Sequence, residues 1–273
     1  MRRWGAALAA AALLLAQGAL ADTSLMSMAT GDESRGWEAV GRLNLGDRGF
    51  CTAALIAPDV VLTAAHCLYD KTTGQRFPIA QMQFLADWRL GRAAAYRGIR
   101  RAVQADGYSY AEANRVTQMG HDLALLQLDQ PIRLPSIRPF AVADGNLHAG
   151  DTVAVVSYAQ DRAEAPSLQQ TCGVEGNRPG VLIMSCSIDF GASGAPVFVR
   201  RNGVPVIVSV ISAMAEADGQ RVSLGVDLAD ALPPLEARLS AAINGTLVET
   251  APVQATGGLS GATAPGGAKF LRP

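Results

Sequence analysis

The chain has 273 residues, in which 23 lysine and arginine residues face 24 aspartate and glutamate residues, so that the formal net charge is −1. This weak and mixed charge gives no electrostatic reason to expect a nucleic acid or an anionic membrane surface as a partner. Alanine is abundant and arginine far outnumbers lysine, which we interpret as a hint of a GC-rich bacterial genome.

The first 21 residues have the three parts of a secretory signal peptide. Two arginines give a positive start, residues 6–16 form a short apolar run, and Ala-Leu-Ala at 19–21 matches a small-x-small cleavage site. A membrane anchor is the alternative, but the run is short for a span and ends in a cleavable pattern. We therefore expect a soluble mature chain that begins at Asp22, carries a net charge of −3 and is exported to the periplasm or outside the cell.

Beyond the signal, the composition divides the chain into three parts. Residues 22–36 are small and polar, which predicts an irregular segment. Residues 37–248 have the composition of one globular domain. Residues 249–273 are rich in glycine, alanine, threonine and proline and have little to bury, which predicts a flexible tail.

Short β-rich runs separated by turn signals fill the globular part, which favours a sandwich or barrel over alternating β and α units. One helix is predicted late in the chain: Pro233 and Pro234 would begin it, residues 235–243 would form it, and Asn244-Gly245 would end it. The expected strands are 37–45, 50–57, 60–65, 122–128, 151–158, 181–187, 195–200 and 204–212.

An even number of cysteines in an exported chain indicates disulfide bonds. Four cysteines allow three pairings, and their order favours Cys51–Cys67 and Cys172–Cys186. Four free thiols are the alternative, which an oxidising compartment disfavours. A zinc site is disfavoured because no pair has close C-x-x-C spacing, and His121 and His148 lack partners at ligand spacing. We expect no metal and no cofactor.

Three stretches could carry chemistry together: LTAAHC at 62–67, HDLALLQL at 121–128 and GASGAP at 191–196. Each alone has an ordinary interpretation, with His66 as a packed histidine, Asp122 as a turn residue and Ser193 as a loop serine. In combination they supply the base, the acid and the nucleophile of acyl transfer. Their chain order of His, Asp and Ser differs from that of subtilisin and of the α/β-hydrolases.

On these motifs the sequence resembles the chymotrypsin-like, trypsin-fold serine proteases over roughly residues 37–245. TAAHC matches the histidine motif of that family, and GASGAP resembles its serine motif. The resemblance implies an all-β fold of two six-stranded antiparallel barrels with a short C-terminal helix, and an active site between the barrels. It also identifies Cys51–Cys67 with the disulfide beside the catalytic histidine.

The resemblance implies a role for each matching residue. Ser193 would be the nucleophile, His66 the general base and then acid, and Asp122 the residue that holds the imidazole. The backbone N–H groups of Gly191 and Ser193 would form the oxyanion hole. Ser212 would contact the catalytic aspartate and begin the strand that pairs with the substrate backbone. His121, next to Asp122, is a weaker alternative as the base.

One position departs from the animal trypsins. They carry an aspartate before the nucleophile, which pairs with a new N-terminus after cleavage, whereas this chain has Ala192. No IVGG-like sequence precedes His66 at the matching distance either. The chain therefore resembles the bacterial secreted glutamyl endopeptidase-like members more closely. We expect the site to be competent without a cleavage after Arg35 or nearby.

The specificity pocket is less clearly defined by the motifs. The family pattern would place Ser187 at the base of the pocket, and Met214 and Gly225 on its walls beside Ser212. A neutral residue at the bottom of the pocket would favour substrates with small or apolar side chains. Glutamyl-specific relatives carry a histidine where this chain has Ile211, which argues against a glutamate-binding pocket.

Polypeptides are the partners that this interpretation predicts, with a monomer as the expected state. The main alternative is a protease-like protein that no longer cleaves and serves in binding or regulation, for which Ala192 and Met214 are the arguments. A chaperone-protease subunit is a third possibility, which we disfavour because no PDZ-sized segment follows Val248.

Overall fold

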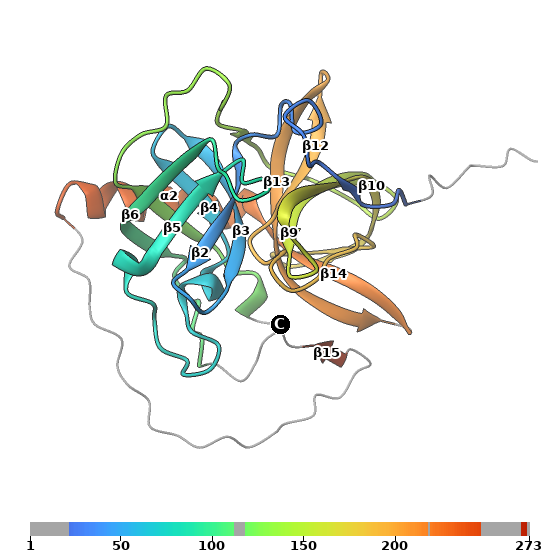
Figure 1. Ribbon diagram of the computed structural model, residues 1–273. Coiled ribbons are helices and arrows are strands. Elements are labelled where there is room, and N and C mark those ends of the chain that lie inside the picture. Colours follow the sequence, from blue (N-terminus) through green and yellow to red (C-terminus); the bar gives the residue numbers. More distant parts are fainter. Residues whose placement is uncertain (1–21, 112–117, 218, 247–268, 272–273) are drawn as a thin grey trace, which may run out of the picture.

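A computed structural model describes residues 22–111, 118–217, 219–246 and 269–271. Two β-barrels lie side by side in it (Figure 1). The expected signal peptide at 1–21 lies outside the described residues, as does most of the expected tail. No helix within the described ranges is long and apolar enough to cross a membrane.

The first barrel is a closed ring of six antiparallel strands. Its strands pair in the order β2-β3-β4-β7-β6-β5. β7 is buried at all five of its residues, as expected for the apolar run ALLQL in the wall of a filled barrel. The strand bounds are β2 Val40–Leu45, β3 Phe50–Ala57, β4 Val60–Thr63, β5 Met82–Ala86, β6 Ala95–Gln104 and β7 Ala124–Leu128.

The second barrel closes in the same way, because β9 pairs both with β12 and with β10. Two short strands extend the sheet at its margins, and a third, β8 (Ala141–Val142), pairs with β13 in parallel. The ring strands are β9 Thr152–Ala159, β10 Arg162–Arg178, β11 Val181–Met184, β12 Pro196–Arg201, β13 Val204–Ala217 and β14 Gln220–Asp227, and the other two marginal strands are β1 Met26–Ser27 and β15 Lys269–Leu271.

Three aromatic rings pack together where the barrels meet. Trp37 precedes the first barrel, Phe140 lies in the connection between the barrels, and Phe198 belongs to β12. The Phe198 ring centroid lies 4.9 Å from that of Trp37 and 4.8 Å from that of Phe140, in edge-to-face contacts. Such contacts add to the burial of the rings themselves, so this cluster fixes how the barrels are placed.

The C-terminal helix α2 (Leu228–Ile243) packs against the first barrel, although the chain enters it from the second. Its apolar face consists of four buried leucines at helical spacing: Leu228, Leu232, Leu235 and Leu239. The expected start at Pro233 was wrong by five residues. Asp227 caps the helix, since its carboxylate accepts a 3.0 Å hydrogen bond from the Ala229 N–H.

The fold class predicted from the sequence is confirmed, with differences in detail. Four ring strands were not predicted: β5, β6, β10 and β14. Two segments expected to be irregular contain short strands, since β1 pairs with β10 and β15 pairs with β13. In both segments the pairing partner is distant in sequence, so the local composition could not indicate it.

Candidate active site

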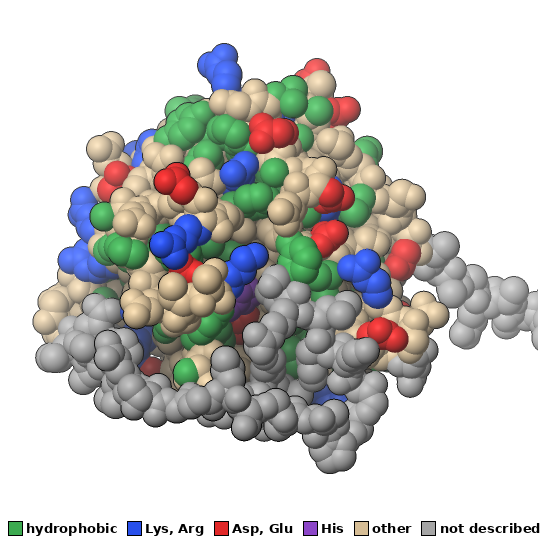
Figure 2. Space-filling model, turned by 60° about the horizontal axis from the view of Figure 1, so that its bottom comes forward, with side chains coloured by type: hydrophobic (Ala, Val, Ile, Leu, Met, Phe, Trp, Pro, Cys, Tyr) green, Lys and Arg blue, Asp and Glu red, His purple; other side chains and the backbone are tan. Residues whose placement is uncertain are grey.

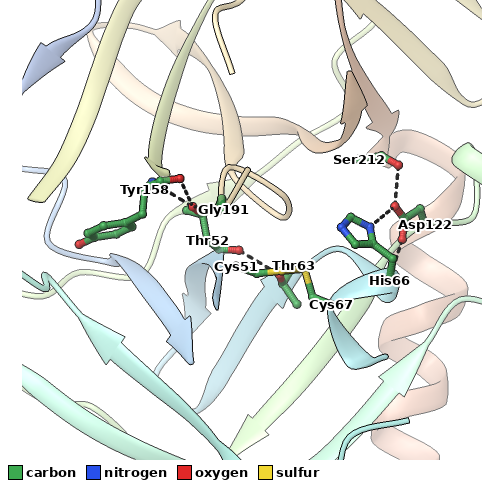
Figure 3. The surroundings of a disulfide bond; sticks show 9 residues. All are labelled: Cys51, Thr52, Thr63, His66, Cys67, Asp122, Tyr158, Gly191 and Ser212. Carbon is green, nitrogen blue, oxygen red and sulfur yellow. Dashed lines mark hydrogen bonds and ion pairs between the residues drawn. A yellow bond between two sulfur atoms is a disulfide. The ribbon is translucent and has the colours of Figure 1, made fainter. Parts of the chain in front are cut away.

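His66 lies on a short 3₁₀ turn, Ala65–Leu68, directly after β4. The disulfide Cys51–Cys67 joins this turn to β3. The His66 backbone N–H donates to Asp122 Oδ1 at 2.8 Å, and the His66 ring atom Nδ1 lies 2.7 Å from Asp122 Oδ2 (Figure 3). The same carboxylate therefore fixes both the backbone and the ring of the histidine.

Asp122 is 4% exposed, at the point where the chain enters β7. Its third hydrogen bond comes from the Ser212 hydroxyl on β13, which donates to Oδ2 at 2.5 Å. A buried carboxylate is stable only when it is well hydrogen-bonded, and Asp122 meets that condition with donors from both barrels. The pair of His66 and Asp122 is thereby tied to the second barrel.

Ser193 lies in a tight turn that needs glycine on both sides. Gly191 has φ +98° and Gly194 has φ +78°, conformations that other residues rarely adopt. A Cβ atom at Gly191 would come within 2.4 Å of the Phe50 ring, and one at Gly194 within 2.1 Å of Thr63 Oγ1. The spacing G-x-S-G is therefore what lets this turn approach the first barrel.

Two peptide groups in this turn have a defined orientation. The Phe190 carbonyl accepts from the Gln160 N–H at 2.6 Å, and the Ala192 carbonyl accepts from the Ala195 N–H at 2.9 Å. In a trans peptide the N–H points opposite to the carbonyl. The N–H groups of Gly191 and Ser193 thus point away from these partners. Both residues line a cavity between the two barrels, which we call the main cavity.

Thr52, which the sequence analysis did not single out, connects the turn to the first barrel. Its N–H donates to the Ser193 carbonyl at 2.8 Å, and its hydroxyl donates to the Gly191 carbonyl at 2.9 Å. The hydroxyl also accepts from the Tyr158 N–H at 3.0 Å, and the Thr52 carbonyl accepts from the Thr63 hydroxyl at 2.9 Å (Figure 3). The N–H, the hydroxyl and the carbonyl of this buried residue therefore all form hydrogen bonds. A threonine beside a cysteine in a strand gives no sequence signal for this role.

A cavity of about 420 Å³ contains these groups together: His66, Asp122 and Ser193 line it, and so do Gly191 and Ser212. On the side of the first barrel its wall is aromatic, where the rings of Tyr69 and Tyr110 stack at 5.0 Å. The residues that the sequence predicted for catalysis and for the oxyanion hole thus face one space, at the junction of the two barrels.

A second pocket, of only about 10 Å³, adjoins Ser193. Ile211 and Met214 line it with apolar surface, and Asp189 is the acidic residue on its wall. Met214 is 8% exposed and lines both this small pocket and the main cavity. The small pocket therefore has no room for a large side chain.

Two residues expected in the specificity pocket lie elsewhere. Ser187 is exposed, and its N–H donates to Gln169 Oε1 at 2.7 Å. Gly225 faces the barrel interior, where a Cβ would come within 2.3 Å of Ser209 Oγ and 2.9 Å of the Met184 methyl. Neither residue lines the small pocket, whose wall includes Ile188, Asp189 and Phe190 instead.

The segment before Ser193 is packed against the hairpin between β9 and β10. Ala192 is fully buried, and its N–H donates to the Asp189 carbonyl at 2.9 Å. Arg162 lies on this hairpin and donates to Ser157 Oγ at 3.1 Å. Burial lowers the pKa of the Arg162 guanidinium, while the charges of Asp161 and Asp189 act in the opposite direction. A partly buried cation therefore lies near the segment where the animal trypsins have an aspartate.

The second disulfide, Cys172–Cys186, joins β10 to the segment after β11, as the order of the cysteines predicted. Cys51, His66 and Cys67 form the one group of three potential metal ligands among the residues that the structure describes. Both of its sulfurs are in a disulfide, so this group does not fit a metal ion. His121 and His148 are exposed and do not line the cavity.

The surface agrees with the mixed charge of the chain. On the face in Figure 2, basic and acidic side chains are interspersed with hydrophobic ones. No patch of a single sign stands out on that face.

Comparison with known proteins places these features in context. Residues 51–206 match the family model of the trypsin-like peptidase domain. A Glu endopeptidase structure, in complex with MPD, superposes with a TM-score of 0.64 at 17% identity, over 82% of this chain and 98% of that one. This likeness shows that the two share a fold.

Several curated proteins are similar in sequence, among them the following three. The modular serine protease of Drosophila melanogaster is 37% identical over 34% of this chain and 15% of its own length. Serine protease 23 of Bos taurus is 27% identical over 55% and 44% of the respective lengths. The glutamyl endopeptidase of Bacillus licheniformis is 25% identical over 55% and 45%. The chain spans less than half the length of each of these relatives.

Proposed function

The chain belongs to the trypsin-like peptidase family, and from that premise we propose that it is a serine endopeptidase that hydrolyses peptide bonds through an acyl-enzyme on Ser193. The observation that carries the proposal is the hydrogen-bonded set of Ser212, Asp122 and His66 facing the same cavity as Ser193. Acyl transfer requires this combination of nucleophile, base and orienting carboxylate.

In the proposed reaction the Ser193 hydroxyl oxygen attacks the substrate carbonyl carbon, and His66 Nε2 takes the hydroxyl proton. The tetrahedral intermediate then collapses, the C–N bond breaks, and His66 returns the proton to the leaving amine. Water, deprotonated by His66, hydrolyses the acyl ester and restores Ser193. Asp122 stays ionised throughout, which fixes the proton on Nδ1 and stabilises the imidazolium.

The negative charge on the carbonyl oxygen would be stabilised by the N–H groups of Gly191 and Ser193. Their orientation is fixed in advance by the bonds from Gln160 and Ala195 to the carbonyls of the two peptide groups. Donors that need not reorganise as charge develops stabilise the transition state more than the ground state. No pairing with a new N-terminus is part of this arrangement, so we propose that the site is competent without trypsinogen-type cleavage.

We propose that the residue before the scissile bond is small. The pocket beside Ser193 holds about 10 Å³, which suits glycine, alanine or serine. One relative is named a glutamyl endopeptidase, but Asp189 on the pocket wall would repel a substrate carboxylate, and Ile211 offers it no hydrogen bond. This chain would therefore not share a preference for glutamate.

The two disulfides and the N-terminal sequence support export. We propose that residues 1–21 are removed as a signal peptide and that the enzyme acts in the periplasm or outside the cell.

Digestion of an unfolded protein tests the proposed activity. We expect the chain from Asp22 to cleave reduced casein, with small residues on the N-terminal side of the cut sites in mass spectrometry. The Ser193→Ala variant, at equal purity, should lose roughly 10⁶-fold in kcat. Equal digestion by wild type and variant, or none by either, would favour the alternative of a binding protein.

A further inference from the structure

The long strand β13 has one edge that changes partner along its length. β14 pairs with β13 from Ser209 to Ala217 and so covers one edge of that stretch. On the other edge, β12 pairs with β13 up to Val210. Backbone hydrogen bonds with Gly194 and Ala195 extend this contact to Ile211. Beyond Ile211, no ring strand among the described residues pairs with that second edge, and its backbone groups can accept another strand.

Residues near the C-terminus of the chain occupy this free edge. In β15, Lys269 pairs with Glu216, Phe270 with Ala215 and Leu271 with Met214, all antiparallel. β14 pairs with the same three residues of β13, so β15 must lie on the edge that β12 leaves. Figure 1 shows β15 as a separate strand at the end of the second barrel, far in sequence from its neighbours.

This edge leads directly to the candidate active site. Ser212, Ala213 and Met214 line the cavity that contains Ser193 and His66. β13 runs away from the cavity after Met214, so an antiparallel partner runs toward it. The C-terminal end of β15 is therefore the end nearest to Ser193. The acyl half of a peptide substrate, which lies on the N-terminal side of the scissile bond, would approach Ser193 in the same direction.

We infer that the segment Lys269–Leu271 occupies the edge of β13 that a peptide substrate would use and thereby competes with substrate. This inference rests on the proposed function. A strand has only one set of hydrogen-bonding groups on each edge, so β15 and an extended substrate exclude one another. Because Met214–Glu216 would pair with the acyl half of the substrate, loss of β15 should act on substrate binding and leave the chemical step unchanged.

The tether determines how strong this competition is. Residues 247–268 connect the end of the domain to β15, and a tethered peptide of such length reaches an effective concentration in the millimolar range. A three-residue pairing is weak, so a millimolar local concentration gives partial and reversible occupancy. The expected effect is a KM that is higher in the full chain, independent of protein concentration.

Deletion of the pairing segment tests the inference. We would compare the chain 22–273 with a variant lacking residues 269–273 and with a control lacking five residues of the connection, 257–261. The first deletion should lower KM for a peptide substrate about threefold or more with kcat unchanged. The control should keep the KM of the full chain. A synthetic peptide with the sequence of residues 262–273 should inhibit the shortened chain competitively.

A second measurement does not depend on catalysis. In the Ser193→Ala background, deletion of 269–273 should raise hydrogen exchange of the backbone amides in residues 214–216, and the control deletion should not. Equal KM values together with unchanged exchange would overturn the inference. If neither chain cleaves peptides, the proposed function fails, while the exchange result still decides whether the segment pairs with β13.

Discussion

Thr52 shows how a residue without catalytic chemistry can determine the geometry of the site. Its hydroxyl and N–H hold the carbonyls of Gly191 and Ser193, the two residues proposed as oxyanion donors. Each of these carbonyls belongs to the peptide group that directly follows a donor residue, so a shift of either group would move the donor residue and the N–H that it presents to the substrate oxygen. We therefore regard Thr52 as a positioning residue.

The Thr52→Val variant keeps the shape of the side chain and removes the hydroxyl. The Gly191 carbonyl and the Tyr158 N–H then lose a buried partner, which should cost about 1–3 kcal/mol of unfolding free energy. We expect kcat to fall roughly tenfold or more with little change in KM, because the oxyanion donors act in the transition state.

Thr52→Ser serves as the matched control, since it keeps the hydroxyl. It should restore most of kcat, with stability followed by urea denaturation. If Thr52→Val loses stability but keeps the kcat of the wild type, the residue is structural only.

At the scale of single elements, the loop after His66 depends on one carboxylate. Asp70 Oδ1 accepts from the N–H groups of Thr72 and Thr73, at 2.7 and 3.2 Å, and Oδ2 pairs with Arg48. The hydrogen bond from Thr72 is the largest cause that lowers the pKa of Asp70, with Thr73 and Arg48 acting in the same direction. The loop lines the main cavity, so its order matters to the site.

A lowered pKa in the folded state gives a definite pH dependence of stability. The ionised Asp70 stabilises the fold fully above its unfolded pKa of about 3.9, and this contribution is lost as pH falls through the lower folded pKa. We expect Asp70→Ala to lower the unfolding free energy at pH 7, with a difference from wild type that shrinks toward pH 3.

Asp47→Ala is the control for this series, because Asp47 is an exposed aspartate in the turn next to Arg48. Urea denaturation at pH 7, 5 and 3 provides the measurement. A deficit for Asp70→Ala that stays constant across this pH range would contradict the assigned role of the carboxylate.

Some strands could be predicted from their own residues alone, and others could not. Runs such as FCTAALIA and VPVIVSVIS are apolar enough to predict β3 at its observed bounds and the start of β13, although β13 continues five residues beyond the predicted end, to Ala217. β10 could not be predicted in this way, because RAEAPSLQQTCGVEGNR is polar and contains proline and glycine. It is a strand because β9 and β11 pair with it along its length, with irregular register, and those contacts are not local.

For the whole molecule, short motifs in chain order predicted the fold class and which residues would meet at the barrel junction. Their catalytic roles stay predictions. Ser187 was placed by counting six residues back from Ser193, and Gly225 by its likeness to a wall glycine of the family; neither lines the small pocket beside Ser193. Thr52 was missed because its partners lie in the other barrel, which only the closed structure brings near.

The architecture joins the two barrels through the site itself. Asp122 from the first barrel accepts a hydrogen bond from Ser212 of the second, and Thr52 of the first holds the turn of Ser193 in the second. We propose that this junction activates Ser193 as a nucleophile. That claim can be tested without knowledge of the natural substrate.

Labelling with a fluorophosphonate probe is the most direct test, because the probe reacts with serines activated by a neighbouring base. The chain from Asp22 should incorporate one probe, and mass spectrometry should locate it on Ser193. His66→Ala and Ser193→Ala, both verified as folded, should not be labelled. If the folded wild-type chain takes up no probe, or if Ser193→Ala is still labelled, the account of this site is wrong.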